Sequence, residues 1–568
     1  MTWATRTKDA FSSRRAFLKA IETKEVDGGQ GAYNEDLLPT EPEQQSWGWI
    51  HFFTYYLTTT FSPTSYNLGA SLATIGLRWW HTFIAAAIAS TILSIIVILN
   101  SRGATKYHVG FPVITRSSSG PRGAKLFIFV RGAVAVIYFS TNLYYGGRLM
   151  AIVLRCIFGT AWDNFPNHLP ADAGITSANL LAFFIFWFFQ MGLMFVHPTV
   201  LRHIFVVKAF YSTIALFAVL GWCVHQNHGS LGSFDFKGQV FLSGSELVWP
   251  MISAINSVCA ALCPILINQP DIARYAQKPS QATWSQTLGI YISKLLVIFL
   301  SAGTTSAAQG FLGASYWNVW DLYDAILTAY WGSGARAGIF FACVGMVLAI
   351  LATNAGTNAL PAGADMAGLL PRFINIVRGQ IICGILGALF FPWKIIANAS
   401  SFLTFLSSYT VFLMPICGIM VVDYWLVRRG NLHLPSLYSC EPGTPYTYWK
   451  GWNLRAIVAW LAGTAFVIHG VAGAMKPSLT NQASKDMYKM GFLLSFLVGS
   501  GVYYAGCVIF PPPIYPEDRE NTPKTWEYMA TSKGFFEGES IDTIRLGNGI
   551  VGVGLEKDIS RTSEKETV

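Results

Sequence analysis

Apolar stretches of roughly 20 residues recur along almost the whole chain, and no other feature constrains the fold as strongly. Each is long enough to cross the hydrocarbon core of a bilayer, which is about 30 Å thick. Only 12% of the residues are charged and 52% are apolar, which excludes an ordinary soluble domain, and the short alternating segments of a membrane barrel are missing. We therefore predict an all-α polytopic membrane protein. About twelve stretches qualify: near 49–77, 79–100, 126–156, 177–196, 207–225, 247–267, 288–310, 336–360, 379–396, 402–426, 455–474 and 490–510.

The positively charged residues gather in every second connection between these stretches, and therefore on one side of the membrane. The first 46 residues are polar and lack the apolar core of a signal peptide. The connections 157–176 and 311–335 contain aspartates but no lysine or arginine. Since cytoplasmic loops are enriched in Lys and Arg, both termini are predicted to be cytoplasmic; the one exception is the last external connection, with Lys476, Lys485 and Lys489. The basic residues assigned to the cytoplasmic side are Arg6, Lys8, Arg14, Arg15, Lys19, Arg102, Lys106, Arg116, Arg122, Lys125, Arg202, Lys208, Arg274, Lys278, Arg372, Arg378, Arg428 and Arg429.

Two of the stretches carry helix-breaking residues near their middle. The first contains TTTFSPTS over 58–65, and the sixth contains Asn256 and an interior Pro264. Proline removes a backbone donor, and hydroxyl side chains offer the backbone alternative hydrogen bonds. A broken first and a broken sixth span, five apart, are what an inverted five-plus-five repeat predicts, with a binding site at the midplane. The alternative is that these residues only pack helices together.

The third and eighth stretches carry amide side chains that could also face a binding site. The eighth ends in ATNAGTNALPAGAD over 352–365, where Asn354 and Asn358 lie one helical turn apart and face the same side. In the third, Tyr138 and Asn142 are also four residues apart. An aromatic ring beside an amide can hold a flat heterocycle by stacking and hydrogen bonding. The alternative is that these groups join neighbouring helices.

Motifs of enzymes and ATP-driven pumps are missing from the sequence. It contains no Walker phosphate loop, no GxSxG, no HExxH and no glycine-rich dinucleotide turn. Its nine cysteines suggest neither a disulfide nor a zinc site. The sequence therefore predicts secondary transport, with no enzyme activity, no cofactor, no metal and no nucleic-acid partner.

Several motifs together resemble the fungal uracil/allantoin permease branch of the nucleobase:cation symporter-1 family, which also includes uridine and thiamine carriers. The resemblance runs from about residue 46 to 511 and implies a LeuT-like fold: two inverted five-helix repeats followed by two extra helices. The motifs are SWG (46–48), GASLATIGLRWWHTF (69–83), YHVGFPVITR (107–116), VRG (130–132), INQPDIARYAQKP (267–279), SGARAGIFF (333–341), GADMAGLLPRFINIVRGQ (363–380) and DYWLVRRG (423–430).

The resemblance also implies which residues bind the substrate. The family's span-8 amide falls on Asn358, and the rest of that segment is expected to let the helix end against the site. The usual tryptophan and glutamine of span 3 are replaced by Tyr138 and Asn142, and the second aromatic falls on Leu262. A change of about one methylene alters discrimination by about 1–3 kcal/mol, so these departures bear on substrate choice. The residues around the first break, Phe61, Ser62 and Pro63, complete the expected set.

Ion coupling and gating are assigned through the same resemblance. Sodium-coupled relatives use two adjacent hydroxyls and a carbonyl one turn earlier on span 8. Here the hydroxyl positions are Ala352 and Thr353 and the carbonyl belongs to Ala349, so one hydroxyl is missing. This loss favours proton coupling. Thr404 and Phe405 on span 10 are expected to gate the external side.

We thus expect a plasma-membrane symporter in the lipid bilayer that imports a nucleobase-like heterocycle, such as uracil or allantoin, with protons. A thiamine or nucleoside-type carrier of the same fold, or a non-transporting nutrient sensor, remains an alternative. Regulatory modification could act on the tails. The expected parts are an N-terminal tail (1–46), a transporter domain (47–511) with repeats over 47–225 and 246–428 and extra helices over 455–511, and a C-terminal tail (512–568).

Overall fold

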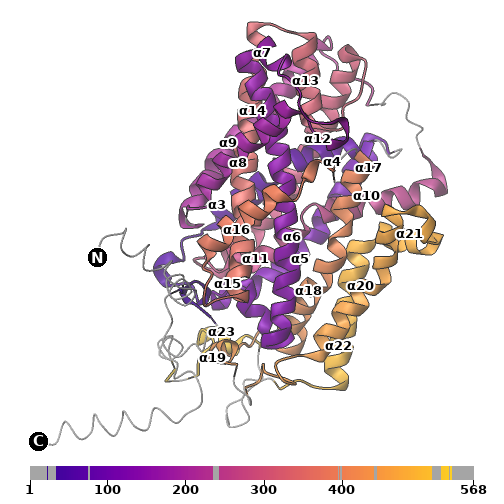
Figure 1. Cartoon of the computed structure of the whole chain (residues 1–568). Coiled ribbons are helices and arrows are strands. Elements are labelled where there is room, and N and C mark those ends of the chain that lie inside the picture. The colour runs from indigo at the N-terminus through magenta and orange to yellow at the C-terminus, as the bar shows by residue number, and fades with distance from the viewer. Residues whose placement is uncertain are drawn as a thin grey trace, which may run out of the picture.

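The computed structural model describes residues 22–23, 33–73, 77–196, 198–234, 242–394, 396, 399–440, 444–513, 526–536 and 538–539. Over these residues the regular structure is helical, apart from two isolated bridges between single residues. The long helices run side by side from one end of the molecule to the other (Figure 1). The basic residues expected in the first 21 positions lie outside the described residues.

The helices occur where the apolar stretches predict them. Nine helical spans in the described part are long and apolar enough to cross a membrane. Two shorter apolar helices, α8 and α16, occupy the fourth and ninth expected positions, and the first position holds the pair α3 and α4. The segments of the expected first repeat are α3 (Trp49–Thr60), α4 (Pro63–Ala73), α5 (Trp79–Tyr107), α6 (Phe111–Phe158), α8 (Ser177–Leu193) and α9 (Pro198–Gln226).

The second expected repeat and the extra helices follow in the same order. Its segments are α10 (Val248–Ala260), α11 (Cys263–Ala273), α12 (Trp284–Leu312), α14 (Ser333–Thr353), a π-helical turn (Asn354–Ala359), α15 (Leu360–Leu369), α16 (Ile376–Leu389), α17 (Ala399–Ser408) and α18 (Thr410–Val422). The extra helices are α20 (Leu454–Met475) and α22 (Gly491–Ile509), and both pack against α18. The short helices are α7 (Thr160–Asp163), α13 (Val319–Ala329), α19 (Leu434–Tyr438), α21 (Gln482–Lys489) and α23 (Tyr528–Thr531).

Both expected helix breaks are present, and the sequence explains where they fall. α3 ends at Thr60, and α4 starts at Pro63, whose missing N–H is no loss at a helix start. Between them, Phe61 has a non-helical ψ of 72°. α10 ends at Ala260 and α11 begins at Cys263, directly before Pro264. The prediction of broken first and sixth spans is confirmed.

The connection expected between the second and third spans is itself helical. α6 begins at Phe111 and bends at Gly120, whose φ of +78° suits glycine and leaves its neighbours' donors free. The carbonyl of Gly451 fills this gap, because it accepts the N–H of Arg122 at 2.9 Å. The basic residues assigned to this connection, such as Arg116 and Arg122, therefore belong to a bent helix.

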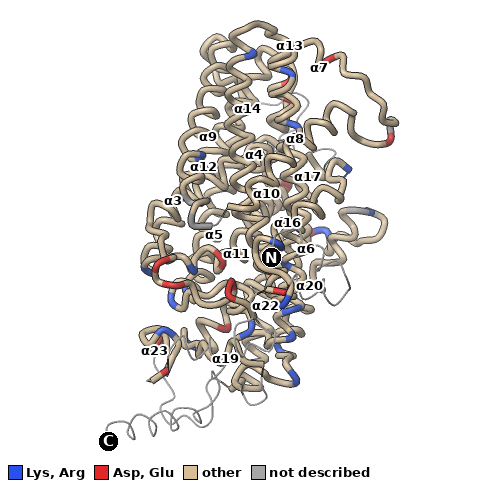
Figure 2. Tube along the Cα trace, turned by 60° about the vertical axis from the view of Figure 1, so that its left-hand side comes forward, with Lys and Arg blue, Asp and Glu red and all other residues tan. Residues whose placement is uncertain are grey.

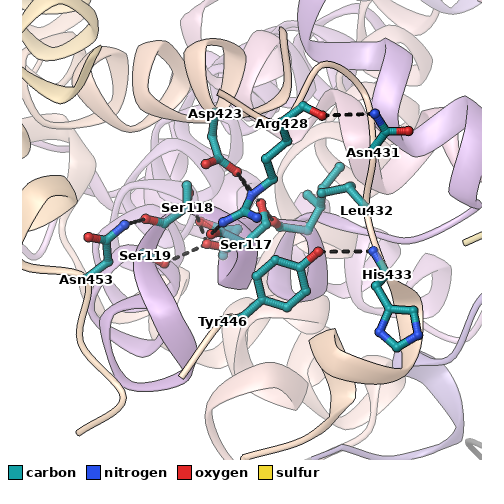
Figure 3. Close-up of polar contacts among 12 residues, drawn as sticks. Ser117, Ser118, Ser119, Asp423, Arg428, Asn431, Leu432, His433, Tyr446 and Asn453 are labelled. Atoms are coloured by element: carbon teal, nitrogen blue, oxygen red, sulfur yellow. Dashed lines mark hydrogen bonds and ion pairs between the residues drawn. The ribbon is translucent and has the colours of Figure 1, made fainter. Parts of the chain in front are cut away.

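A buried polar cluster fixes the extra helices to the start of α6 (Figure 3). Asp423, in the π-helical turn Asp423–Val427 after α18, pairs with Arg428 at 3.0 Å and accepts the Ser117 hydroxyl at 2.7 Å. Tyr503 of α22 donates to the same carboxylate at 2.8 Å. Asn453, which precedes α20, donates to the Ser118 carbonyl at 2.6 Å. Since both charges are buried, each needs these partners.

Parts of both tails pack against one end of the molecule, which we call the α23 end; the opposite end, with α7 and α13, is the α13 end (Figure 1). Asn34 donates to the Ile374 carbonyl at 3.0 Å, and the Leu37 carbonyl accepts from Tyr438 at 2.8 Å. Leu37 is only 1% exposed. The described residues 33–46 thus form a packed segment where we expected a polar tail, because apolar side chains and backbone partners occur within it.

The C-terminal segment docks at the same end. Glu527 forms two 2.7 Å hydrogen bonds with Arg102 at the end of α5, and the Met529 N–H donates to Asn431 at 3.0 Å. The Arg102 guanidinium holds the pKa of the Glu527 carboxyl below its usual value. Charged residues gather toward the α23 end, with a smaller group at the α13 end (Figure 2). The structure thus has two charged ends joined by apolar helices.

Candidate functional site

An aromatic cluster joins the third span to the second break. Tyr138 of α6 stacks on Phe405 of α17, with ring centroids 5.6 Å apart and planes 29° from parallel. Tyr409 meets Tyr138 edge-on at 5.1 Å and donates its hydroxyl to the Tyr138 hydroxyl at 3.1 Å. The same Tyr409 oxygen lies 2.5 Å from the carbonyl of Ala260, the last residue before the second break. The predicted stacking residue and one predicted gate residue are therefore in contact.

The two asparagines of the eighth span form a chain of hydrogen bonds toward α6. Asn358 Nδ2 donates to Asn354 Oδ1 at 2.7 Å, and Asn354 Nδ2 donates to the Phe139 carbonyl at 3.3 Å. Both amides face the same side, as predicted. Asn354 reaches the backbone immediately after Tyr138, so the amide pair and the aromatic cluster belong to one region.

The expectation that the eighth span ends at this point is wrong. The segment Asn354–Ala359 is a π-helical turn, and the chain continues without interruption into α15. A π-helical turn adds a residue to the helical path and is common at functional sites. Asn268 of α11 donates to the carbonyl of Thr357 at 2.8 Å, so this turn is held by a side chain from beyond the second break.

The break residues line the gaps between the half-helices. Ser62 accepts the N–H groups of Ser65 and Tyr66, each at 3.1 Å, which caps the start of α4 through backbone bonds. Phe61, Ser62 and Leu262 are buried, as is Asn142 on α6. α4, which follows the first break, packs against α17 and against α10, which precedes the second break. Pro63 starts α4, as expected.

The position expected for a cation is next to a lysine. Thr353 Oγ1 donates to the Ala349 carbonyl at 2.8 Å and accepts a hydrogen bond from Lys208 Nζ. Lys208 is 2% exposed and lies inside the span His203–Gln226. Its assignment to a cytoplasmic connection is therefore wrong, because Lys208 belongs to the apolar helix α9, where its amine donates to the Thr353 hydroxyl.

The α13 end of this region is covered by aromatic rings. Trp320 of α13 stacks on Tyr145 of α6 at 5.2 Å and 22°, and Trp317 contacts Phe402 of α17 at 5.9 Å. Thr404, the second predicted gate residue, contributes its carbonyl, which accepts from Tyr488 of α21 at 2.9 Å. α13 and α17 thus form a cover over the region on this side.

A buried charge cluster closes the α23 end. Arg131 of α6 pairs with Asp365 of α15 at 2.5 Å and with Asp271 of α11 at 2.6 Å. The Arg131 guanidinium also lies 3.8 Å from the centre of the Phe111 ring. Three spans are therefore tied together by one cation on the side where the tail segments dock.

Three residues of this region were not selected from the sequence. Tyr409 lies four residues after Phe405, so its helical spacing was the available signal. Lys208 stands alone in the apolar run from Ile204 to Phe217. Arg131 belongs to a quoted motif, but its partners are 140 and 234 residues away, which no local pattern reveals.

Comparisons with known proteins show what the chain as a whole is similar to. The model of a family described as permeases for cytosine/purines, uracil, thiamine and allantoin matches residues 39–499. The allantoin permease of Saccharomyces cerevisiae (strain ATCC 204508 / S288c) is 32% identical over 502 residues, which cover 87% of this chain and 78% of that protein. The uracil permease of the same yeast is 31% identical over 519 residues, covering 90% and 81%.

A solved structure has the same fold. Mhp1, a nucleobase-cation-symport-1 family transporter in a closed conformation with bromovinylhydantoin bound, has a TM-score of 0.67 to this structure. The likeness covers 88% of this chain and all of that one at 20% identity. The expected LeuT-like arrangement is confirmed.

Proposed function

This chain belongs to the family of permeases for cytosine/purines, uracil, thiamine and allantoin, and on that premise we propose that it imports a small nucleobase-like heterocycle, such as uracil or allantoin, with protons. It is a membrane transporter and not an enzyme. We place it in the plasma membrane with the α23 end, and so both termini, in the cytoplasm.

One observation supports the heterocycle most directly: α6, which carries an aromatic ring and an amide, packs against the π-helical turn that carries a second amide. The Tyr138 ring stacks on Phe405, Asn142 lies one turn further along α6, and the Nδ2 of Asn358 bonds Asn354. A ring that carries imide or ureide groups would take over that bond and use both donors and acceptors. The hydantoin bound by Mhp1 is such a ring.

In alternating access, the aromatic cover and the Arg131 cluster would act as the outer and inner gates. In the proposed cycle, the cover formed by Trp320 and Tyr145, with Phe405, opens to the outside. The Arg131 cluster with Asp271 and Asp365 then opens to the cytoplasm. Each closure joins helices from both repeats, so each can break as one repeat moves relative to the other.

Lys208 supports proton coupling in place of sodium coupling. Its amine lies beside Thr353 and Ala349, the two positions left from the sodium ligands of relatives. When protonated, this amine repels a sodium ion, and the same group can carry the transported proton.

A thiamine-type substrate is the second candidate, and Leu262 favours it. Leu262 lies in the second break, where the resemblance places an aromatic ring, and a leucine leaves more room for a two-ring ligand. The family description includes thiamine carriers.

Competition for uptake tests both candidates. The full chain is expressed in cells that lack their own carriers, and uptake of labelled uracil, allantoin, uridine and thiamine is measured. We expect saturable uptake of uracil or allantoin that Asn358→Ala abolishes, while Asn164→Ala, on an exposed turn, leaves it unchanged. Uptake of thiamine alone would support the second candidate. Binding without uptake of any compound would overturn transport and indicate a sensor.

A further inference from the structure

A second buried lysine lies beside the first break and has no role in the function proposed above. Lys294, in the middle of α12, is 0% exposed. Its Nζ lies 3.4 Å from the hydroxyl of Ser65, in the first turn of α4. Among the residues that the structure describes, no carboxylate forms an ion pair with it. Arg131 and Arg428 are as deeply buried, and each has aspartate partners.

The surrounding helices cannot supply a counter-charge. α12 packs on α3, α4, α5 and α9, and none of these five helices contains an aspartate or glutamate. The acids of α13, Asp321 and Asp324, lie at the α13 end, where they pair with Arg148 and Arg155. Cys259, on α10, is a buried thiol near Lys294. The other ionisable side chains on the packed helices are His51, Tyr55, Tyr56, Tyr66, His81, Arg102, Lys106, Tyr107, Arg202, His203, Lys208, Tyr211, Cys223 and His225, with Tyr291 on α12 itself.

An ammonium group in this place is costly. Removing a charge from water costs several kcal/mol unless an opposite charge compensates, and one hydroxyl at 3.4 Å is a weak substitute. The closed structure is therefore most stable with a neutral amine at Lys294. Protonation requires that the surroundings change, which gives the residue two states linked to conformation.

The groups near Lys294 belong to the two interrupted spans. Ser65 lies three residues after Ser62, and Cys259 lies three residues before Leu262, so the amine is close to the inner edges of both interrupted spans. If α4 moves away from α12, Lys294 loses its one hydroxyl partner and gains access to water. The amine then takes up a proton.

We propose that Lys294 is a second proton-binding residue of the carrier, which binds a proton when α4 separates from α12 and releases it when Ser65 returns. This proposal rests on the proposed proton-coupled import and adds to it a group distinct from Lys208. The two lysines contact different helices: Lys208 meets α14, and Lys294 meets α4.

The first test compares two substitutions in purified protein reconstituted into vesicles. Lys294→Met keeps the length of the side chain without the amine, and Lys294→Arg keeps a permanent charge. We expect Lys294→Met to retain uptake but to release about one proton fewer per substrate, and Lys294→Arg to lose more than about tenfold of the uptake. Lys125→Met, on an exposed face of α6, is the matched control.

A second measurement does not depend on transport. If Lys294 is neutral in the folded protein and charged when unfolded, unfolding binds a proton, and stability rises with pH. Thermal unfolding of the parent should therefore shift upward between neutral and alkaline pH, and this shift should be smaller in Lys294→Met. This result would stand even if none of the tested heterocycles were transported, in which case only the proposed function fails.

Three outcomes would overturn the proposal. Lys294→Met could release as many protons per substrate as the parent and have the same pH-dependent stability, which would show that Lys294 does not bind the proton. Lys294→Arg could transport at the parent's rate, which would show that a neutral form is not needed. Loss of parent uptake when chloride is replaced by gluconate would mean that an anion balances a permanently charged Lys294.

Discussion

Asn358 and Asn354 face each other across one turn of the π-helical segment, with the Asn358 amide nitrogen 2.7 Å from the Asn354 oxygen. Asn354 is in turn bonded to the Phe139 carbonyl, so it is anchored to α6. Asn358 is the member of the pair whose bond a ligand can replace without breaking the link between α14 and α6. We therefore expect Asn354 to have a structural role and Asn358 to be the amide that contacts the ligand.

We expect Asn358→Ala to abolish uptake while the protein still reaches the cell surface. Removing a hydrogen-bonding group from a buried binding site costs about 1–3 kcal/mol, which corresponds to a loss of about 5- to 150-fold. Uptake and surface labelling are measured on the same cells. Asn354→Ala should instead lower thermal stability, because it breaks the contact with Phe139. Parent-like uptake by Asn358→Ala would remove this residue from the site.

The fold could be predicted because its signals are local. Apolar runs define the spans, and Pro63 and Pro264 mark the breaks without any knowledge of distant contacts. The amide pair was also predictable, since four-residue spacing places side chains on one face of a helix. The continuous helical path through Asn354–Ala359 was not predictable. Pro361 stands at the second position of α15, and from the sequence alone such a proline cannot be distinguished from one that follows the end of a helix.

The rest of the site depends on pairing between distant segments. Lys208 was counted among loop residues because its position near a predicted span edge fits a cytoplasmic connection, whereas its contact with Thr353 joins residues 145 positions apart. Tyr409 reaches Tyr138 across 271 positions. The packed segment around Leu37 was missed because polar composition outweighs a few apolar residues in a window average.

Lys208→Met should change the ion dependence of uptake. The parent is expected to import faster as the external pH falls, and its uptake rate should not change when sodium is replaced by choline. The variant loses the amine beside Thr353, so we expect its uptake to fall at least about tenfold and to lose acid stimulation. Initial rates at several pH values, with and without sodium, check this. A strict sodium requirement in the parent would contradict proton coupling.

Arg131→Met should destabilise the α23 end. It leaves Asp271 and Asp365 buried without their cation, and breaking a buried ion pair costs about 3–5 kcal/mol. Thermal unfolding in detergent is expected to occur at a clearly lower temperature. Arg372→Met, which affects an exposed pair with Glu22, is the control and should have little effect. An unchanged unfolding temperature in Arg131→Met would show that the cluster does not hold the three spans together.

Docking of the C-terminal segment should be insensitive to pH until strongly acidic conditions. The hydrogen bonds from Arg102 lower the pKa of Glu527, so its contribution is present above the unfolded value of about 4.3 and is lost as pH falls through the lower folded value. Protease cleavage around residues 526–539 should therefore stay slow from pH 7 to about 5 and rise below about 4. Glu527→Gln should speed cleavage at neutral pH by up to about fivefold, as expected for about 1 kcal/mol. Glu246→Gln, at an exposed position far along the chain, should not; equal effects of the two variants would exclude a specific contact.

Leu262→Phe tests how the second break sets the size of the substrate. Leu262 is buried in the second break, two residues after Ala260, whose carbonyl accepts from Tyr409 of the aromatic cluster. If the site holds a single-ring heterocycle, the added ring can stack on it and uptake of uracil or allantoin should be kept or improved. Two-ring competitors should weaken by about 1–3 kcal/mol, the range for a small change in pocket shape. Inhibition constants for uracil, allantoin and thiamine, measured against one labelled substrate in both proteins, give this difference directly. Equal weakening of all three competitors would show that Leu262 supports the packing of the break and does not face the substrate.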